Sequence, residues 1–264
     1  DSGENAVVSP YSVLIALAMT ANGASGETRT QMETVLGLSV AQLNAYLLAC
    51  GQKNTNELNA ANAIWLREDY PVSEDFLQCS RDYYGAEVTS AAFNSDTRDR
   101  INDWVNYQTR GMIEKILDDM DPDAVMYLVN ALAFQASWKH EYPESDARPE
   151  VFHGASGDRQ ATLMYSDESY YMHDENTAGF LKDYENDRFC YVVLLPDKSV
   201  SLEDYVASLT GEKLTALIAN ASNESIHTVM PKFTNDCSFE LSEALQAMGA
   251  GRVKVFFAAV LPSA

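Results

Sequence analysis

Apolar residues in the first half of the chain recur mainly with the spacing of α-helices. Residues 11–22 are apolar on nearly every side, and Ser9 and Pro10 before them supply an N-cap and a helix-opening proline. This segment is therefore predicted to be a buried helix. Residues 58–66 interrupt the helical pattern and are typical of a strand. The further predicted helices are residues 30–36, 39–51, 73–84 and 96–110.

An apolar run over residues 124–138 stands out from this pattern. Between Val125 and Phe134 every residue except Asn130 is aliphatic, aromatic or methionine. A continuous apolar run with charged residues at both ends predicts a strand covered on both faces, and therefore one at the centre of a sheet. A buried amide needs hydrogen-bond partners, because leaving it unpaired costs about 1–3 kcal/mol. We therefore expect a polar site inside the central sheet at Asn130.

Short alternating segments with turn residues between them follow residue 138. Helices concentrated early in the chain, with antiparallel strands later, predict an α+β fold in a single domain. The predicted strands are residues 162–165, 169–173, 189–195 and 225–232, and the predicted helices are residues 201–208, 210–220 and 238–248.

Composition and charge exclude some classes of partner. Of the 264 residues, 46% are apolar and 22% are charged, which is an ordinary globular balance. The formal net charge of −21 repels phosphate backbones, so we expect no nucleic-acid partner. The densest apolar run, residues 13–19, ends at Thr20 and falls well short of the roughly 20 residues that span a bilayer. We therefore expect no membrane partner.

The sequence lacks the motifs of catalysis and metal binding. No histidine lies in an H-E-x-x-H arrangement, no segment has the G-x-S-x-G spacing, and no cysteines have the C-x-x-C spacing. The acidic run around Asp119 resembles a calcium loop, but it has Ala124 and Asn130 where glycine and glutamate are needed. We expect no enzyme activity, no cofactor and no metal, with the cysteines as free or buried thiols. The residues concerned are His140, His153, His173, His227, Cys50, Cys79, Cys190 and Cys237.

Several short segments match, in order, those of one protein family. Together with the run at residues 128–142 they resemble the serpin family, of which the chain is identified as a member. The resemblance implies an α+β fold with three β-sheets, of which the central one is large, surrounded by about eight helices. The matching segments are Asn5–Ser12, Gly23–Met32, Asn62–Trp65, Tyr83–Val88, Ile101–Val105, Thr109–Ile113, Leu194–Pro196 and Met230–Phe233.

The resemblance also implies where the sheet opens. It places Ser9 and Ser12 beneath the central sheet near Asn130, in the region called the shutter. It places Trp138 at the top of the sheet, in the breach, where an inserting loop first enters. The alternative reading is that the serines are a helix cap and a packed hydroxyl, and that Trp138 is a core aromatic.

The function implied by the resemblance is inhibition of proteases by a suicide-substrate mechanism. A protease cuts an exposed reactive loop, which then inserts into the central sheet as a new strand before the acyl-enzyme is hydrolysed. The expected target is a serine protease, with a cysteine protease as the alternative; neither the target nor the reactive-site bond can be read from this chain. The runners-up are a non-inhibitory serpin-fold binding or carrier protein and an inactive truncated serpin.

Further expectations concern partners and location. Heparin-activated serpins use a basic helix in the region equivalent to residues 39–62, but here Lys53 and Glu57 are the only charges in that segment, which argues against a heparin site. We expect a monomeric, extracellular or secreted protein. Asn220 and Asn223 fit the glycosylation sequon, a pattern that is common by chance.

The end of the chain does not match the family. We expect a serpin core over residues 1–250 and an unmatched segment at residues 251–264, which holds Arg252 and Lys254 and no acid. The later central strand, the reactive loop and the closing core strands are not recognisable there. The first helix of the fold is not recognisable before Asp1 either, and a leader removed ahead of this residue is compatible with the missing Met. The alternatives are a truncated chain, a rearranged chain and a sequence joined across gaps.

Overall fold

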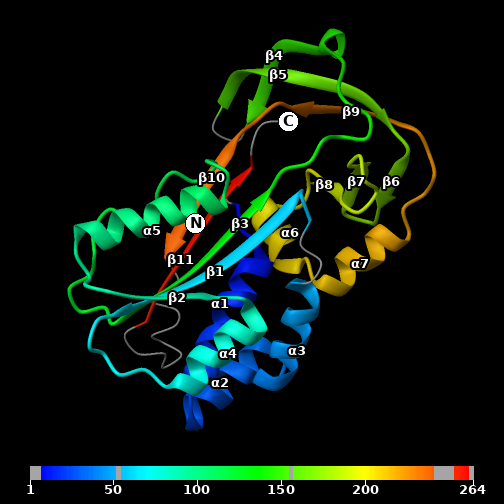
Figure 1. Cartoon of the computed structure of the whole chain (residues 1–264). Helices are drawn as coiled ribbons and strands as arrows, with labels where there is room; N and C mark the ends of the chain where they lie inside the picture. The colour runs from blue at the N-terminus through cyan, green and yellow to red at the C-terminus, as the bar shows by residue number, and fades with distance from the viewer. Residues whose placement is uncertain (1–6, 52–54, 155–156, 241–252, 262–264) are drawn as a thin grey trace. The chain divides into compact units, whose positions relative to one another are not determined.

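The computed structural model describes residues 7–51, 55–154, 157–240 and 253–261 (Figure 1). Its internal contacts group into two compact units, which are described separately. The first comprises residues 1–135 and 234–263, and the second residues 136–233. The expected domain boundary after residue 250 lies outside the described residues and stays a prediction.

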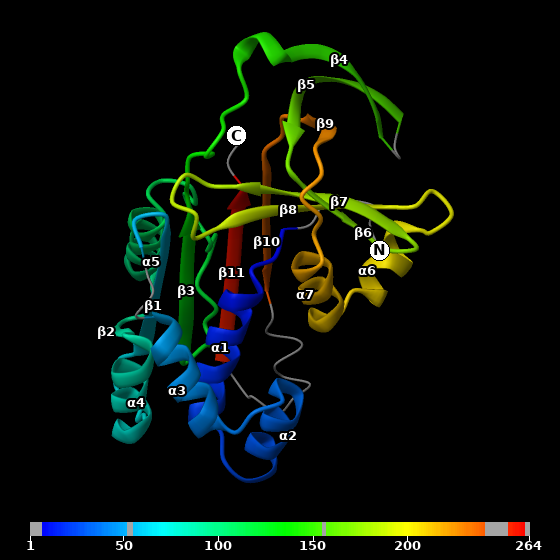
Figure 2. The same cartoon turned by 90° about the vertical axis from the view of Figure 1, so that its right-hand side faces the viewer.

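The first unit contains a five-stranded sheet in the order β10-β11-β3-β1-β2. Strand β3 is antiparallel to β1 and parallel to β11 (Figure 2). The predicted central strand is thus confirmed. The strands are β1 (Leu58–Arg67), β2 (Glu87–Ala91), β3 (Met126–Phe134), β10 (Asn235–Glu240) and β11 (Val253–Leu261).

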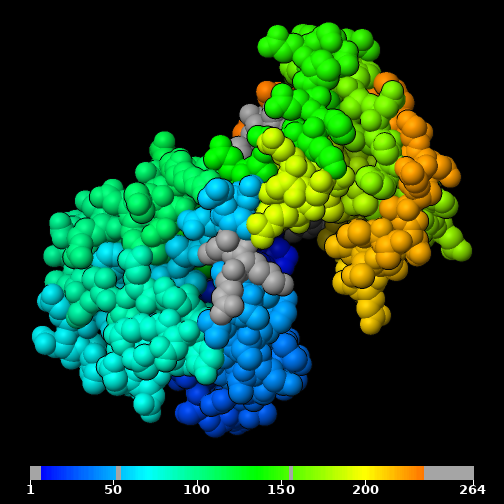
Figure 3. Space-filling model, turned by 45° about the vertical axis from the view of Figure 1, so that its right-hand side comes forward, coloured from blue at the N-terminus to red at the C-terminus, as the bar shows by residue number. Residues whose placement is uncertain are grey.

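Helices cover both faces of β1 and β3, which explains their continuous apolar sequences. Successive side chains of a strand point to opposite faces. Ile64 and Leu128 belong to the core formed with α1, whereas Trp65 and Val129 belong to the core formed with α5. Helices α3 and α4 lie side by side in this unit (Figure 3). The helices are α1 (Pro10–Gly23), α2 (Gly26–Leu36), α3 (Val40–Gly51), α4 (Glu74–Tyr84) and α5 (Ser95–Gln108).

The second unit contains two three-stranded sheets, in the orders β4-β5-β9 and β6-β7-β8. Together with the five-stranded sheet they confirm the expected three-sheet α+β fold. The elements are η1 (Glu144–Asp146), β4 (Ala147–Gly154), β5 (Gly157–Glu168), β6 (Tyr170–His173), β7 (Thr177–Asp183), β8 (Cys190–Pro196), α6 (Leu202–Ser208), α7 (Gly211–Ala219) and β9 (Ile226–Pro231).

Strands β4 and β7 were not predicted, for different reasons. Strand β4 is mostly exposed, so it shows no alternation of apolar and polar residues. Strand β7 has buried positions on both faces, but two of them are occupied by Gly179 and Lys182, which lie on opposite faces. A Cβ at Gly179 would lie 2.3 Å from the Val193 carbonyl oxygen, so the two strands approach too closely there for a larger residue.

Three predictions about secondary structure need correction. The apolar run at residues 124–138 forms a strand only as far as Phe134, and Trp138 instead bridges to Tyr184. Residues 238–240, predicted to begin a helix, belong to strand β10, and the rest of that predicted helix lies outside the described residues. Residues 253–261, where no strand was recognised, form β11.

No single helix in the described segments is long and apolar enough to span a membrane. Only the bent pair α2 and α3, with 51° between its halves, meets the length and composition criteria together.

Candidate functional site

The candidate site lies between strands β3 and β11 of the five-stranded sheet. The side of β3 that faces β11 over residues 130–133 is called the seam. In the described register, Val253–Phe256 of β11 pair with Met126–Val129 of β3. Beyond Phe256, β11 continues to pair with β10, while β3 continues to pair with β1. The described β3–β11 ladder therefore ends directly before Asn130.

The side-chain amide of Asn130 has a strong hydrogen bond at its nitrogen but none at its oxygen among the described residues. Its Nδ2 donates to Asn62 Oδ1 at 2.8 Å, and the two residues are cross-strand partners in β3 and β1. Asn62 Nδ2 in turn donates to the backbone oxygen of Tyr84 at 2.8 Å. Asn130 Oδ1 is buried and has no hydrogen-bond partner among the described residues. A strand that brought a donor to this atom would recover part of the roughly 1–3 kcal/mol that an unpaired buried acceptor costs.

The strand period places the Asn130 side chain on the same face as Leu128, which packs with α1. Helix α1 itself packs against β3 and β11. The helix that carries Ser12 therefore packs against both strands that border the seam. Of the predicted site residues, the structure brings Asn130 and this helix together.

The two serines bond to each other. Ser9 is the N-cap of α1, and its Oγ accepts from the Ser12 backbone N–H at 3.2 Å. Ser12 is buried. Among the described residues no hydrogen bond joins either serine to Asn130, so the alternative reading of Ser9 as a helix cap describes the structure. A role for these serines in sheet opening stays a prediction.

Replacing Ser9 by Ala should lower the free energy of unfolding by about 1 kcal/mol, because the first turn of α1 loses its side-chain acceptor. Ser9→Gly should cost only a few tenths of a kcal/mol, because glycine is tolerated at an N-cap. Urea denaturation of both variants measures the difference. Equal losses in the two variants would show that the cap is not what Ser9 contributes.

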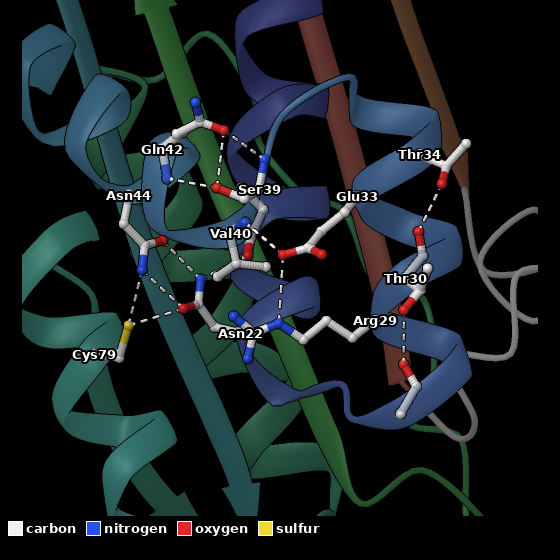
Figure 4. Close-up of polar contacts among 12 residues, drawn as sticks. Asn22, Arg29, Thr30, Glu33, Thr34, Ser39, Val40, Gln42, Asn44 and Cys79 are labelled. Carbon is white, nitrogen blue, oxygen red and sulfur yellow. Dashed lines mark hydrogen bonds and ion pairs between the residues drawn. The ribbon is translucent and has the colours of Figure 1, made fainter.

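The side-chain amides of Asn22 and Asn44 and the thiol of Cys79 form a polar cluster between helices (Figure 4). Tyr84 connects this cluster to Asn62. The hydroxyl of Tyr84, whose backbone oxygen accepts from Asn62, donates to Asn44 Oδ1 at 2.5 Å and accepts from Asn22 Nδ2 at 3.0 Å. The thiol of Cys79 donates to Asn22 Oδ1 at 2.9 Å. Burial raises the pKa values of both Tyr84 and Cys79. The Cys79 thiol therefore acts as a neutral donor in the packing between α1, α3 and α4.

The other candidate chemistry has no counterpart in the described residues. Cys50, Cys79 and Cys190 are free thiols, and the side chain of Cys237 lies outside the described part of the chain. No group of three or more His, Cys, Asp or Glu side chains among the described residues could hold a metal ion.

A cavity of about 390 Å³ lies in the first unit, lined by residues of α1, α3, α4 and β1 that include Tyr11, Asn62 and Arg81.

In the second unit, Trp138 lies in an aromatic cluster. Its ring stacks on Tyr184 at 4.4 Å between centroids and 9° between planes. Tyr142 and Tyr191 meet the same ring edge-on. The alternative reading of Trp138 as a packed aromatic therefore fits its surroundings, and its role in strand entry stays a prediction.

Burial raises the pKa of Tyr184 to about 12. Since the folded state favours the neutral phenol, this stabilisation is complete below pH 10 and is lost as the pH rises through about 12. A spectrophotometric titration should show a tyrosine ionising near pH 12, and Tyr184→Phe should remove that component. An unchanged titration curve in the variant would contradict the assignment.

Sequence reasoning missed a buried ion pair beside this cluster. Lys182 Nζ lies 2.6 Å from Glu168 Oε1, with side-chain exposures of 3% and 10%. The signal that could have revealed it is a lysine on the inward-facing side of a strand, two residues after the core residue Phe180. Lysine is so seldom buried that the segment did not resemble a strand with an apolar face.

Comparison with known proteins decides the family. The model of the family described as Serpin (serine protease inhibitor) matches residues 1–257. The chain belongs to the serpin family. The family match thus extends into β11, the strand that forms one side of the seam.

Similar serpins come from distant sources. An uncharacterised serpin-like protein of Thermococcus kodakarensis is 28% identical over 263 residues, covering 95% of this chain and 62% of the relative. The structure of the thermophilic serpin tengpin in its native state has a TM-score of 0.93 at 36% identity, covering all of this chain and 76% of that one. Tengpin in its latent state has a TM-score of 0.88 at 41% identity, covering 95% and 70%.

The same fold occurs in a protein solved in complex with a small molecule. Thyroxine-binding globulin complexed with thyroxine has a TM-score of 0.88 at 22% identity, covering 98% of this chain and 80% of that one, a likeness of fold alone. The serpin chain described here spans about 62% of the length of the Thermococcus relative.

Proposed function

We propose that this chain is the strand-accepting core of a serpin-type protease inhibitor that acts as a suicide substrate. The observation that carries the proposal is the seam, where the described β3–β11 ladder ends directly before Asn130. The side of β3 that faces β11 offers backbone groups to an added strand over residues 130–133, while its other side pairs with β1.

Strand addition at the seam supplies a physical driving force. Each backbone hydrogen bond contributes about 0.5–1.5 kcal/mol net, and a new strand forms a row of them. The added strand can also supply a hydrogen-bond donor to the buried Oδ1 of Asn130. A cut loop that inserts here would move its attached protease before the acyl-enzyme is hydrolysed, so inhibition depends on insertion outrunning hydrolysis.

The neutral amides suit a sheet that must open. The uncharged side chains of Asn62 and Asn130 hold β1 to β3. Separating β3 from β11 at the seam therefore leaves no charged group of this pair without a partner. The proposal assigns a serine protease as target, with a cysteine protease as the alternative, in an extracellular setting and with a monomeric inhibitor. It includes no role for heparin, because residues 39–62 carry only Lys53 and Glu57 as charges.

The test uses the full polypeptide that contains this chain, incubated with trypsin-, elastase- and subtilisin-like proteases. We expect a covalent complex that survives boiling in detergent with at least one of them. A protease whose nucleophile has been removed is the control and should give no complex. Clean cleavage of the polypeptide with full residual protease activity across the panel would contradict the proposal.

A carrier is the second candidate, favoured by the cavity in the first unit. Its volume of about 390 Å³ falls within the roughly 300–1,000 Å³ of small-ligand sites. The measurement is calorimetric titration with small apolar ligands. Binding that Leu47→Trp abolishes, in a polypeptide that forms no protease complex, would favour the carrier over the inhibitor.

A further inference from the structure

The second unit buries a charged pair where aliphatic side chains would fit. Lys182 lies on the inward face of β7, two residues after Phe180, which belongs to the small core formed with Met164 and Met230. Glu168 ends β5 and supplies the carboxylate. Replacing such a pair by apolar side chains of similar volume is often neutral or stabilising, so stability alone does not account for it.

The Ser166 hydroxyl holds the Glu168 carboxylate at the same oxygen, Oε1, that the lysine contacts. Ser166 Oγ donates to Glu168 Oε1 at 2.7 Å and lies 3.0 Å from Thr228 Oγ1. The carboxylate is therefore fixed to β5 and, through Thr228, to β9. A fixed carboxylate in turn fixes the ammonium, which is a compact charge on a flexible stem.

The ammonium faces two aromatic rings. Lys182 Nζ lies 4.4 Å from the centroid of the Tyr142 ring and 5.7 Å from that of Trp138. Both distances are within the roughly 6 Å over which a cation is attracted to a ring face, and the attraction is larger where water is excluded. An apolar side chain of the same size would fill the space without orienting either ring.

Main-chain bonds hold the same segment against the end of β7. Lys139 N donates to Asp183 O at 3.0 Å, and Glu185 N donates to Ser137 O at 2.9 Å. These bonds fix the backbone on both sides of Trp138 and leave the direction of its side chain to be set by contacts. These contacts are the Tyr184 stack, the edge-on rings of Tyr142 and Tyr191, and the Lys182 ammonium.

We propose that Lys182 is a positioning residue, whose ammonium, held by Glu168, fixes the rings of Trp138 and Tyr142 in the segment that follows β3. The resemblance places Trp138 where an inserting strand first enters the sheet. If the proposed function holds, Lys182 thereby sets how fast a cut loop inserts. That last step rests on the proposed function, whereas the positioning itself does not.

The first experiment follows Trp138 by ¹⁹F NMR in protein labelled with 5-fluorotryptophan. Trp138→Phe assigns its resonance, and Trp65 and Trp104, which belong to the first unit, serve as internal references. In the double variant Lys182→Met/Glu168→Met we expect the Trp138 resonance to move by more than its linewidth while the reference resonances stay in place. An unmoved Trp138 resonance would overturn the proposal.

Lys213 offers a matched control in the same unit. Its Nζ lies 5.0 Å from the centroid of the Tyr205 ring and 3.4 Å from Asp174 Oδ2, so it also combines an ion pair with an aromatic contact. Lys213→Met should leave the Trp138 resonance unchanged. A shift equal to that of the double variant would show a general loosening of the unit and would overturn the specific role of Lys182.

A measurement on the unaltered protein keeps the proposal testable if the double variant does not fold. The Lys182 ammonium protons should exchange slowly enough to give a ¹⁵N-correlated signal, with nuclear Overhauser effects to ring protons of Tyr142 and Trp138. A lysine spectrum without any such protected, ring-contacting ammonium would overturn the proposal.

The link to function is tested separately on the full polypeptide. The double variant should change the rate of covalent complex formation by about tenfold, whereas Lys213→Met should not. If the unaltered polypeptide inhibits no protease, the proposed function fails while the NMR results still decide the positioning role. If complexes form at equal rates in both variants despite a moved Trp138, the link to insertion is overturned.

Discussion

Replacing Lys182 alone by Met is expected to lower the free energy of unfolding by about 3–5 kcal/mol, because it leaves Glu168 buried without its charge partner. Ser166 continues to donate to the carboxylate, but a hydroxyl does not compensate a buried charge. Urea denaturation measures the loss.

The double variant Lys182→Met/Glu168→Met is the control for that loss. Removing both charges should restore the free energy of unfolding to within roughly 1 kcal/mol of the unaltered protein, or raise it above that value. A single variant that loses less than about 1 kcal/mol would contradict the buried ion pair. A double variant as unstable as the single one would mean that packing of the lysine stem, not charge, is what the core needs.

Breaking the amide pair at the seam should have the next largest effect. Asn130→Ala removes the donor to Asn62 Oδ1 and leaves that buried atom unpaired, so we expect a loss of about 2 kcal/mol. Asn62→Ala should cost a similar amount, because it also removes the bond to the Tyr84 carbonyl. The double variant should lose less than the sum of the two, with a coupling of about 1 kcal/mol.

Asn59 provides the matched control on the same strand. Its Nδ2 donates to Gln108 O at 2.9 Å. The Asn59→Ala variant therefore also removes a hydrogen bond donated by a side-chain amide of β1, but one that does not involve Asn130. The losses of Asn59→Ala and Asn130→Ala should add to within about 0.5 kcal/mol. Additive losses for Asn62→Ala and Asn130→Ala would contradict the cross-strand contact.

The elements that sequence predicted best are those with both faces buried. Strand β3 was recognised because helices cover both of its faces and leave a continuous apolar run. Its end was misplaced at Trp138, because apolar residues recur there after Gln135, whereas the β-pairing ends at Phe134. Apolar content reports burial, and only backbone pairing determines where a strand stops.

The partners of the site residues could not be read from sequence. Asn130 was identified as a buried amide, but its partner Asn62 follows from the register of β1 against β3, which depends on tertiary pairing. Lys182 was missed because a buried lysine is stabilised by Glu168, fourteen residues away in sequence and on another strand. Strand β11 was missed because its apolar run matches no expected sequence, although pairing with β3 and β10 gives it a place in the sheet.

The most direct test of the seam is amide hydrogen exchange along β3, measured by NMR with and without a capped, extended peptide rich in Thr and Ala. Without the peptide, residues 130–133 should exchange faster on average than residues 126–129, because the described β11 ladder covers only the latter. With the peptide, protection of residues 130–133 should rise by roughly tenfold or more, the equivalent of about one net hydrogen bond per amide. Equal protection along all of β3, unchanged by the peptide, would contradict a sheet that accepts a strand at Asn130.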